Sequence, residues 1–103
     1  MNSLVQTNMV YQLRIPDDIV VVIRGLHPVL KKRVRSALTH ICGNPYAGKA
    51  LKEELVGLRS FRIKPFRIIY KISSDRTIDI IAIGPRNRIY EETYRILKKS
   101  DEI

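Results

Sequence analysis

Residues 59–83 read RSFRIKPFRIIYKISSDRTIDIIAI, a run of three short segments rich in isoleucine, phenylalanine and tyrosine. Aromatic and β-branched residues favour strands, and residues 59–64, 66–73 and 76–83 each have the length of one strand. A proline marks the first turn between them, and a Ser-Ser-Asp sequence supplies turn residues for the second. We therefore expect three consecutive antiparallel strands at the centre of the fold.

The period of two in a strand predicts what each face of this sheet carries. In the first segment Phe61 and Ile63 point to one face, whereas Arg62 and Lys64 point to the other. In the second segment Arg67 lies opposite the aromatic and aliphatic residues around it. One face of the predicted sheet is therefore apolar, and the other carries cations.

The chain is strongly basic, and its charge is concentrated. It has 19 Lys and Arg against 10 Asp and Glu in 103 residues, a formal net charge of +9. Solubility needs less than this, so the excess favours a polyanionic partner, nucleic acid or an acidic protein, over a merely basic surface. Residues 55–74 contain no acid, and the predicted cationic face falls within them.

Upstream of these strands the pattern predicts one more strand and at least one helix. Residues 10–15 alternate in polarity like a half-buried strand, and residues 28–43 repeat apolar side chains at helical spacing. Residues 17–24 give conflicting signals, because Pro-Asp-Asp is typical of a helix start but the five β-branched residues that follow favour a strand. The residues alone leave this segment open.

The end of the chain predicts a short helix. A Gly-Pro pair at 84–85 is expected to stop the last strand. The spacing of Ile89, Thr93, Ile96 and Leu97 then places these four side chains on one side of a C-terminal helix. Strands and helices in this order predict the α+β class.

Length and composition indicate a single domain spanning residues 1–103, with residues 1–9 flexible. No run of about 18 apolar residues occurs and the N-terminal stretch lacks the order of a signal peptide, so we expect a soluble, cytoplasmic protein. The lone Cys42 has no second cysteine with which to form a disulfide or a thiolate metal site. We expect it to be a small buried helix residue.

Two ordered motifs resemble the signature of the RelE/ParE toxin superfamily. The first is FRIKPFRIIY at 61–70, a cation-rich strand followed by an aromatic-Arg-aliphatic-aliphatic-Tyr strand. The second is IGPRNRIY at 83–90, in which Gly-x-Arg precedes an aliphatic-Tyr pair. An Asn-Pro at 44–45 and a Gly-Lys-x-Leu element at 48–51 also resemble the family. The resemblance covers nearly the whole chain.

The resemblance implies an α+β fold of RelE/ParE type. Its elements are a strand, a two-helix hairpin, a three-stranded antiparallel meander and a short C-terminal helix. The hairpin places a helix at residues 17–24, where burial of the apolar side is expected to override a preference worth only tenths of a kcal/mol per residue.

The resemblance also implies a function, that of a toxin in a toxin-antitoxin pair acting as a ribosome-dependent, metal-independent endoribonuclease on mRNA. RNA carries its own nucleophile, the 2′-hydroxyl. Cutting then needs in-line geometry, removal of the hydroxyl proton, stabilisation of the phosphorane charge and protonation of the leaving oxygen. None of these formally requires a metal, and no cofactor is expected.

Three residues take catalytic roles by resemblance. Arg67 would hold the scissile phosphate, Arg86 would stabilise charge and could serve as the acid, and Tyr90 would act as the base. A tyrosine needs positive charge nearby to act as a base at neutral pH, and Arg86, Arg67 and Lys64 would supply it. Tyr94, one helical turn later, competes with Tyr90 for the role.

Three more cations are expected to bind RNA phosphate. Arg62 and Lys64 would take the place of a lysine pair that polarises the phosphate, and Arg88 would add an RNA contact. Whether Lys64 points into the site or sits on the turn stays open. His27 and His40 lie far in sequence from the cationic strands, so a structural or solvent role is favoured for both.

Other functions fit the same residues. ParE-like relatives share the fold yet inhibit DNA gyrase, and a plain RNA-binding or ribosome-associated module would need only the basic face. In that case Tyr90 would be a core or helix-capping aromatic, and Arg62 and Lys64 part of a solvated face. Either toxin function implies a cognate antitoxin, whose acidic or amphipathic segment would cover the cationic face by helix-in-groove packing or strand addition. The ribosome and mRNA are the other expected partners.

Overall fold

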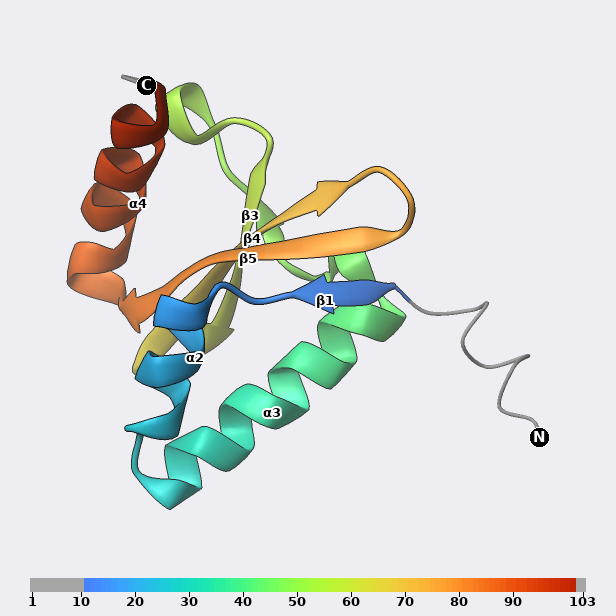
Figure 1. Cartoon of the computed structure of the whole chain (residues 1–103), viewed down its shortest axis with the longest axis vertical. Helices are drawn as coiled ribbons and strands as arrows, with labels where there is room; N and C mark the ends of the chain where they lie inside the picture. Colours follow the sequence, from blue (N-terminus) through green and yellow to red (C-terminus); the bar gives the residue numbers. More distant parts are fainter. Residues whose placement is uncertain (1–10, 102–103) are drawn as a thin grey trace.

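The computed structural model describes residues 11–101. Within them three α-helices pack on a mixed five-stranded sheet with the order β1-β5-β4-β3-β2, so the predicted α+β class is confirmed (Figure 1). The strands are β1 (Gln12–Arg14), β2 (Lys49–Ala50), β3 (Leu58–Ile63), β4 (Phe66–Ser73) and β5 (Thr77–Pro85). The helices are α2 (Asp17–Arg24), α3 (Pro28–Gly43) and α4 (Arg86–Asp101). The stretch expected to be flexible, residues 1–9, lies outside the described residues.

The three central strands confirm the predicted meander. β3 pairs antiparallel with β4, and β4 with β5, through two-residue and three-residue connections. The Lys64-Pro65 peptide in the first turn is cis. The end of β5 differs from the prediction, because Gly84 and Pro85 continue the strand opposite Arg67 and Phe66. A proline is accepted there since it ends the strand, where no further ladder bond needs its N–H.

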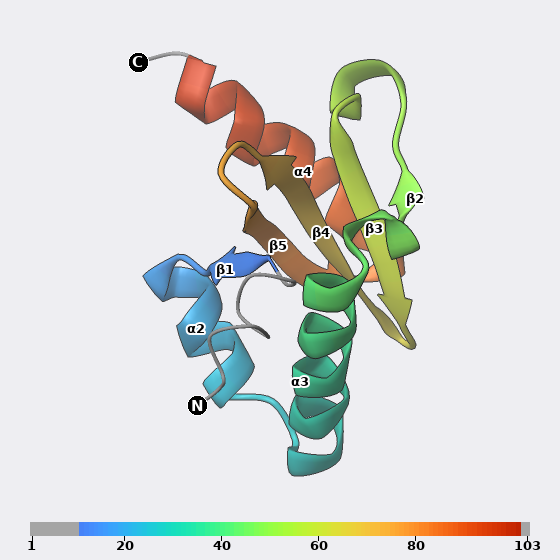
Figure 2. The ribbon, with the colours of Figure 1, turned by 90° about the vertical axis from the view of Figure 1, so that its right-hand side faces the viewer.

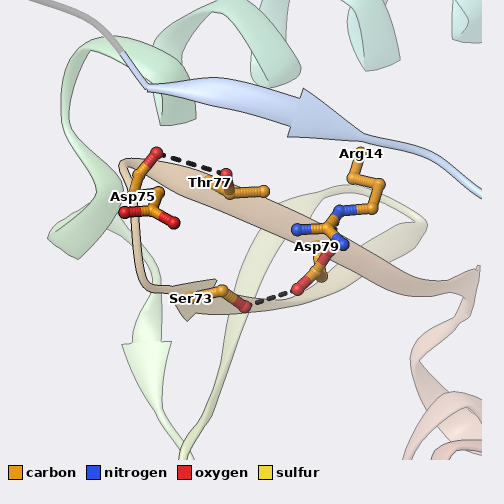
Figure 3. Close-up of polar contacts among 5 residues, drawn as sticks. All are labelled: Arg14, Ser73, Asp75, Thr77 and Asp79. Atoms are coloured by element: carbon orange, nitrogen blue, oxygen red, sulfur yellow. Dashed lines mark hydrogen bonds and ion pairs between the residues drawn. The ribbon is translucent and has the colours of Figure 1, made fainter.

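The far end of the sheet is joined to β1 by a polar cluster. β1 runs parallel to β5, with Arg14 opposite Asp79. Arg14 Nε lies 2.8 Å from Asp79 Oδ1, and the Ser73 hydroxyl donates to the other carboxylate oxygen (Figure 3). Thr77 Oγ1 donates to the Asp75 carbonyl in the same turn, 3.3 Å away. One carboxylate therefore ties together three strands.

The opposite edge strand, β2, was not predicted, because two residues are too few to show alternation. It is anchored by Tyr70, whose buried hydroxyl donates to Pro45 O at 2.7 Å and accepts from Gly48 N at 2.9 Å. A Cβ at Gly48 would lie 2.5 Å from this hydroxyl, so only glycine allows the approach. Burial raises the Tyr70 pKa, against the lowering effects of the Gly48 hydrogen bond and of Arg59.

Helices α2 and α3 cover one face of the sheet (Figure 2). The helix predicted at residues 17–24 is confirmed, although its β-branched residues favour a strand. It buries Ile19 and packs Ile23 against the core, whereas Val21 is 65% exposed. Full burial of one isoleucine contributes roughly 1.5–3 kcal/mol, which exceeds the helix penalty of several such residues. α3 begins as predicted after His27, whose Nδ1 accepts from Val29 N at 3.1 Å.

Helix α4 covers the other face (Figure 2). It was predicted to be short, but it has 16 residues and begins directly after β5. It buries Ile89 and Thr93, with Leu97 partly buried. Ile96 was expected on the same side but is 42% exposed.

The sheet therefore separates two hydrophobic clusters, so the face predicted to carry cations is also apolar where α4 covers it. The larger one lies beneath α2 and α3 and includes Ile41, Ile68 and Tyr70. The smaller one lies beneath α4 and includes Leu58, Ile69 and Ile89, with Tyr90 packed against it. None of the helices among residues 11–101 has the length and apolar character needed to cross a membrane.

Candidate active site

Two adjoining cavities open at the end of the sheet where α4 begins, and Arg67 and Arg86 line both. The larger has a volume of about 400 Å³, and the smaller about 100 Å³. The larger is lined by Lys49, Ala50, Leu51, Lys52, Glu53, Leu55, Arg67, Arg86 and Tyr90. The smaller is lined by Arg62, Lys64, Pro65, Phe66, Arg67 and Arg86. Five of the six residues expected from the sequence thus come together.

The sheet and α4 each contribute part of the site. Arg67 lies near the start of β4, directly opposite Arg62 on β3 and Gly84 on β5. Arg86 is the first residue of α4, and Tyr90 follows four positions later. Residues four apart lie on the same side of a helix, so both side chains reach the same cavity. The direct passage from β5 into α4 is what carries Arg86 beside Arg67.

A buried serine connects Arg67 with Tyr90. Ser60 Oγ lies 3.2 Å from the Tyr90 hydroxyl and accepts a hydrogen bond of 3.2 Å from Arg67 Nη1. Ser60 is 2% exposed and lies on β3, two residues before Arg62 and therefore on the same face of the sheet. It was not predicted, although this spacing could have indicated it.

The electrostatics of the site favour an anion. Arg67 is half-buried, and its Nε is buried without a hydrogen-bond partner among the described residues. Each cavity is lined by four Lys and Arg residues. The positive end of the α4 dipole lies at Arg86, in the same place. An unpaired buried donor beside a helix N-terminus matches the needs of a phosphate group.

Lys64 is on the turn and also lines the smaller cavity. The two positions considered for it, on the turn or in the site, are therefore compatible. The Lys64 carbonyl accepts a hydrogen bond of 3.2 Å from Arg33 Nη1, which ties the turn to α3. Arg62, one strand position before Ile63, is exposed and faces the same cavity. These two cations form the outer wall of the site.

Other expected residues lie elsewhere. Arg88 is exposed and lines neither cavity, because two helical residues turn it about 200° from Arg86. Tyr94 is 41% exposed, with Lys98 Nζ 5.9 Å from its ring centroid, so Tyr90 alone of the two tyrosines lines the cavity. His40 packs against Phe61 on the opposite face of the sheet, with the ring centroids 5.5 Å apart and the rings tilted by 48°.

Three further charged lining residues come from the segment around β2. Lys49 and Lys52 add positive charge, and Glu53 is the one acid among the lining residues of the larger cavity. Glu53 has φ of 56°, a left-handed conformation that costs a non-glycine residue energy. No periodicity marks this short segment, and its one signal in the sequence is the Gly-Lys-x-Leu element that contains Lys49.

Cys42, which was expected to be buried, lines neither cavity of this site. Cys42 is half-buried on α3, and burial raises the pKa of its thiol. Within residues 11–101 no three His, Cys, Asp or Glu side chains gather where they could hold a metal ion.

A separate groove of about 700 Å³ runs between α3 and β3 on the opposite face of the sheet. Its floor is apolar, with Val29, Ala37, Phe61 and Ile63. Lys32, Arg33 and His40 also line it. β2 pairs only with Arg59 and Ser60, so it does not cover the part of β3 beside this groove.

Comparison with known proteins places the chain in a family. A sequence model described as the ParE toxin of the type II toxin-antitoxin system parDE matches residues 28–90. No curated protein sequence matches the chain.

Solved structures of RelE toxins have the same fold. The toxin in the RelBE2 toxin-antitoxin complex from Mycobacterium tuberculosis is 26% identical, with a TM-score of 0.66 over 75% of this chain and 99% of the other. A free mutant of the E. coli toxin RelE is 16% identical, with a TM-score of 0.70 over 89% of this chain and 98% of the other. The archaeal RelE-RelB complex from Pyrococcus horikoshii gives 24% identity and a TM-score of 0.63 over 76% and 97%.

The family match covers more than half of the chain, and the fold agrees with it. The strand motifs that resembled RelE/ParE toxins lie largely within the matched residues. The chain therefore belongs to the ParE toxin family of type II toxin-antitoxin systems, within the RelE/ParE superfamily.

Proposed function

We propose that this toxin is a ribosome-dependent endoribonuclease that cuts mRNA by attack of the RNA 2′-hydroxyl, without a metal. One observation carries the proposal: Arg67, Arg86 and Tyr90 line one cavity, although they come from β4 and two turns of α4. A surface that only held the RNA backbone would need the cations but not the hydroxyl of Tyr90.

The cations account for phosphate binding and charge stabilisation. Arg67 and Arg86 border both cavities, so a phosphate bound between them would receive guanidinium hydrogen bonds from two sides. Arg62 and Lys64 would hold the next part of the RNA backbone in the smaller cavity. As negative charge develops on the phosphorane, these preorganised donors would stabilise it.

Tyr90 and Arg86 supply the proton transfers of the proposed reaction. The phenol of Tyr90 would act as the general base that removes the 2′-hydroxyl proton. Arg86 would stabilise or protonate the leaving oxygen. The ribosome would contribute the in-line geometry of the mRNA, since the site is an open cavity rather than a closed channel.

Inhibition of DNA gyrase is the second candidate, and the matched family favours it. The sequence model carries the ParE name, and the resemblance to ParE-like toxins implies gyrase inhibition by binding. Gyrase inhibition would not depend on the hydroxyl of Tyr90 as an acid-base group. Removal of the Tyr90 hydroxyl oxygen alone therefore distinguishes the two functions.

We also propose a cognate antitoxin as a partner, since related solved structures are complexes with RelB. Its acidic or amphipathic segment would neutralise the cations of the site. The ribosome and mRNA are the proposed targets in the cell, and the proposed location is the cytoplasm.

Induced expression tests the proposal. We would compare wild type with Arg86→Ala and Tyr90→Phe, using Tyr94→Phe as the matched control, and follow growth, the 5′ ends of a translated mRNA and cleaved DNA. Growth arrest with new mRNA ends in wild type and Tyr94→Phe, both lost in the other two variants, is expected. Arrest with intact mRNA and broken DNA would replace this proposal with gyrase inhibition.

A further inference from the structure

We propose that Ser60 is a positioning residue of the cleavage site, which holds Tyr90 through a hydrogen bond and links it to the charge of Arg67. The inference rests on the proposed nuclease function and assigns a role to a residue that does not itself reach the RNA. It comes from three observations: the two hydrogen bonds, the burial of the serine, and its place in the sheet.

The geometry makes Ser60 a junction between distant parts of the chain. Its Oγ lies 3.2 Å from Arg67 Nη1 on β4 and 3.2 Å from the Tyr90 hydroxyl on α4. Tyr90 is 30 positions away in the sequence, so no local turn brings the two together. Both partners line the larger cavity, whereas Ser60 does not. The serine therefore contacts two lining residues without lining the cavity itself.

Hydrogen-bond accounting fixes the donor in one of the two bonds. A guanidinium only donates, so Ser60 Oγ is the acceptor from Arg67. With the neutral Tyr90 hydroxyl, Ser60 Oγ can be either donor or acceptor. Ser60 must be the donor once Tyr90 has given up its proton, because a phenolate oxygen only accepts. Such a bond would strengthen when Tyr90 carries negative charge, because charge-assisted hydrogen bonds are stronger than neutral ones. Ser60 would thus relay the positive charge of Arg67 toward the phenolate.

The burial of the serine is hard to explain by packing alone. Ser60 is 2% exposed, next to Leu58 and Ile69 of the cluster beneath α4. Alanine or valine would fill such a strand position without burying a hydroxyl, which costs free energy unless it is paired. Here the partners that pair it are two residues of the proposed catalytic set.

The test separates turnover from binding in the purified protein acting on ribosomes loaded with one mRNA. We would measure kcat and KM for wild type, Ser60→Ala and Ser60→Thr. Ser73→Ala serves as the matched control, since its hydroxyl is also hydrogen-bonded on β4 but lies at the far end of the sheet. Circular dichroism would confirm that every variant is folded at the assay temperature.

Removal of the hydroxyl is expected to lower kcat about tenfold, the effect of one lost hydrogen bond in the transition state. KM should change less than about twofold, because Ser60 does not touch the RNA. Threonine should restore most of the rate, and Ser73→Ala should cleave like wild type.

Two results would overturn the inference while leaving the nuclease intact: a Ser60→Ala variant with the wild-type kcat, or a folded Ser60→Thr variant as slow as the alanine one. If wild type itself cuts no mRNA, the proposed function fails first. The two failures are therefore distinguishable in one experiment.

Discussion

Arg62 lies directly opposite Arg67 in the β3–β4 ladder, so two guanidinium groups share one side of the sheet. Like charges in directly opposed strand positions destabilise a sheet. Arg67 is also half-buried, with Nε unpaired among the described residues. A bound phosphate would relieve both costs at once, which is a physical reason for this pair to sit at an anion site.

Replacement of Arg62 by glutamine should therefore stabilise the fold and weaken RNA binding. The free energy of unfolding is expected to rise by about 0.5 kcal/mol at low salt, as the opposed charges are removed. The slope of log affinity for RNA against log salt concentration should become shallower by about 0.7, the value for one phosphate contact with a single strand. Urea unfolding and titrations with a short RNA would measure the two effects, with Arg35→Gln on α3 as the charge-matched control. A variant that is less stable than wild type would contradict the first expectation.

Arg86 and Arg88 should differ sharply, although both were expected at the site. Arg86→Ala is expected to lower kcat about 100-fold, as the loss of one preorganised donor does in other enzymes. Arg88→Ala should leave kcat unchanged, because this side chain points away from both cavities. Cleavage of a translated mRNA by the purified variants would measure this. An equal loss of kcat in the two variants would mean that the rate depends on the total positive charge and not on the position of Arg86 in the cavity.

Glu53 should oppose RNA binding. It is the one acidic lining residue of the larger cavity, so Glu53→Gln removes local repulsion of phosphate. We expect the Kd for a short RNA to fall about twofold at low salt, the scale of one exposed charge interaction, and the gain to shrink as salt rises. Glu54→Gln, at the neighbouring exposed position, is the control. A weaker affinity in Glu53→Gln would indicate instead that the carboxylate contacts the RNA.

Tyr70 should make the fold sensitive to alkaline pH. Its phenol is buried between Pro45 O and Gly48 N, so Tyr70→Phe leaves both backbone groups unpaired, at a cost of about 2 kcal/mol near neutral pH. Burial raises the Tyr70 pKa above its value in the unfolded chain. The unfolded state therefore releases its proton first as pH rises.

This contribution to stability is complete below a pH of about 10, the value for a free tyrosine, and is lost as pH rises through the higher folded value. The stability difference between wild type and Tyr70→Phe should accordingly shrink above about pH 10. Urea unfolding at a series of pH values would measure it, with Tyr46→Phe at a 63% exposed position as the control. A difference that stays constant through this range would contradict the assignment.

Helix α2 marks a limit of local prediction. Its five consecutive β-branched residues favour a strand, and only the family resemblance placed a helix there. The deciding interaction is the burial of Ile19 and Ile23 against the core beneath α2 and α3. No local pattern contains that information, because the partners lie on other elements.

The sequence alone determined the meander, since period-two alternation and turn residues act over a few positions of the chain. It did not show that the cation-bearing face also buries Leu58 and Ile69 beneath α4. It also indicated that Arg62, Lys64 and Arg67 share a cationic face, and all three line the smaller cavity. Only the tertiary structure decided that Ser60 contacts both Arg67 and Tyr90. It also decided that Arg88 lines neither cavity. The contacts of Ser60 depend on the β3–β4 register and on the rotation of α4 about its axis, and burial of Ile89 in one cluster with Leu58 of β3 orients the helix.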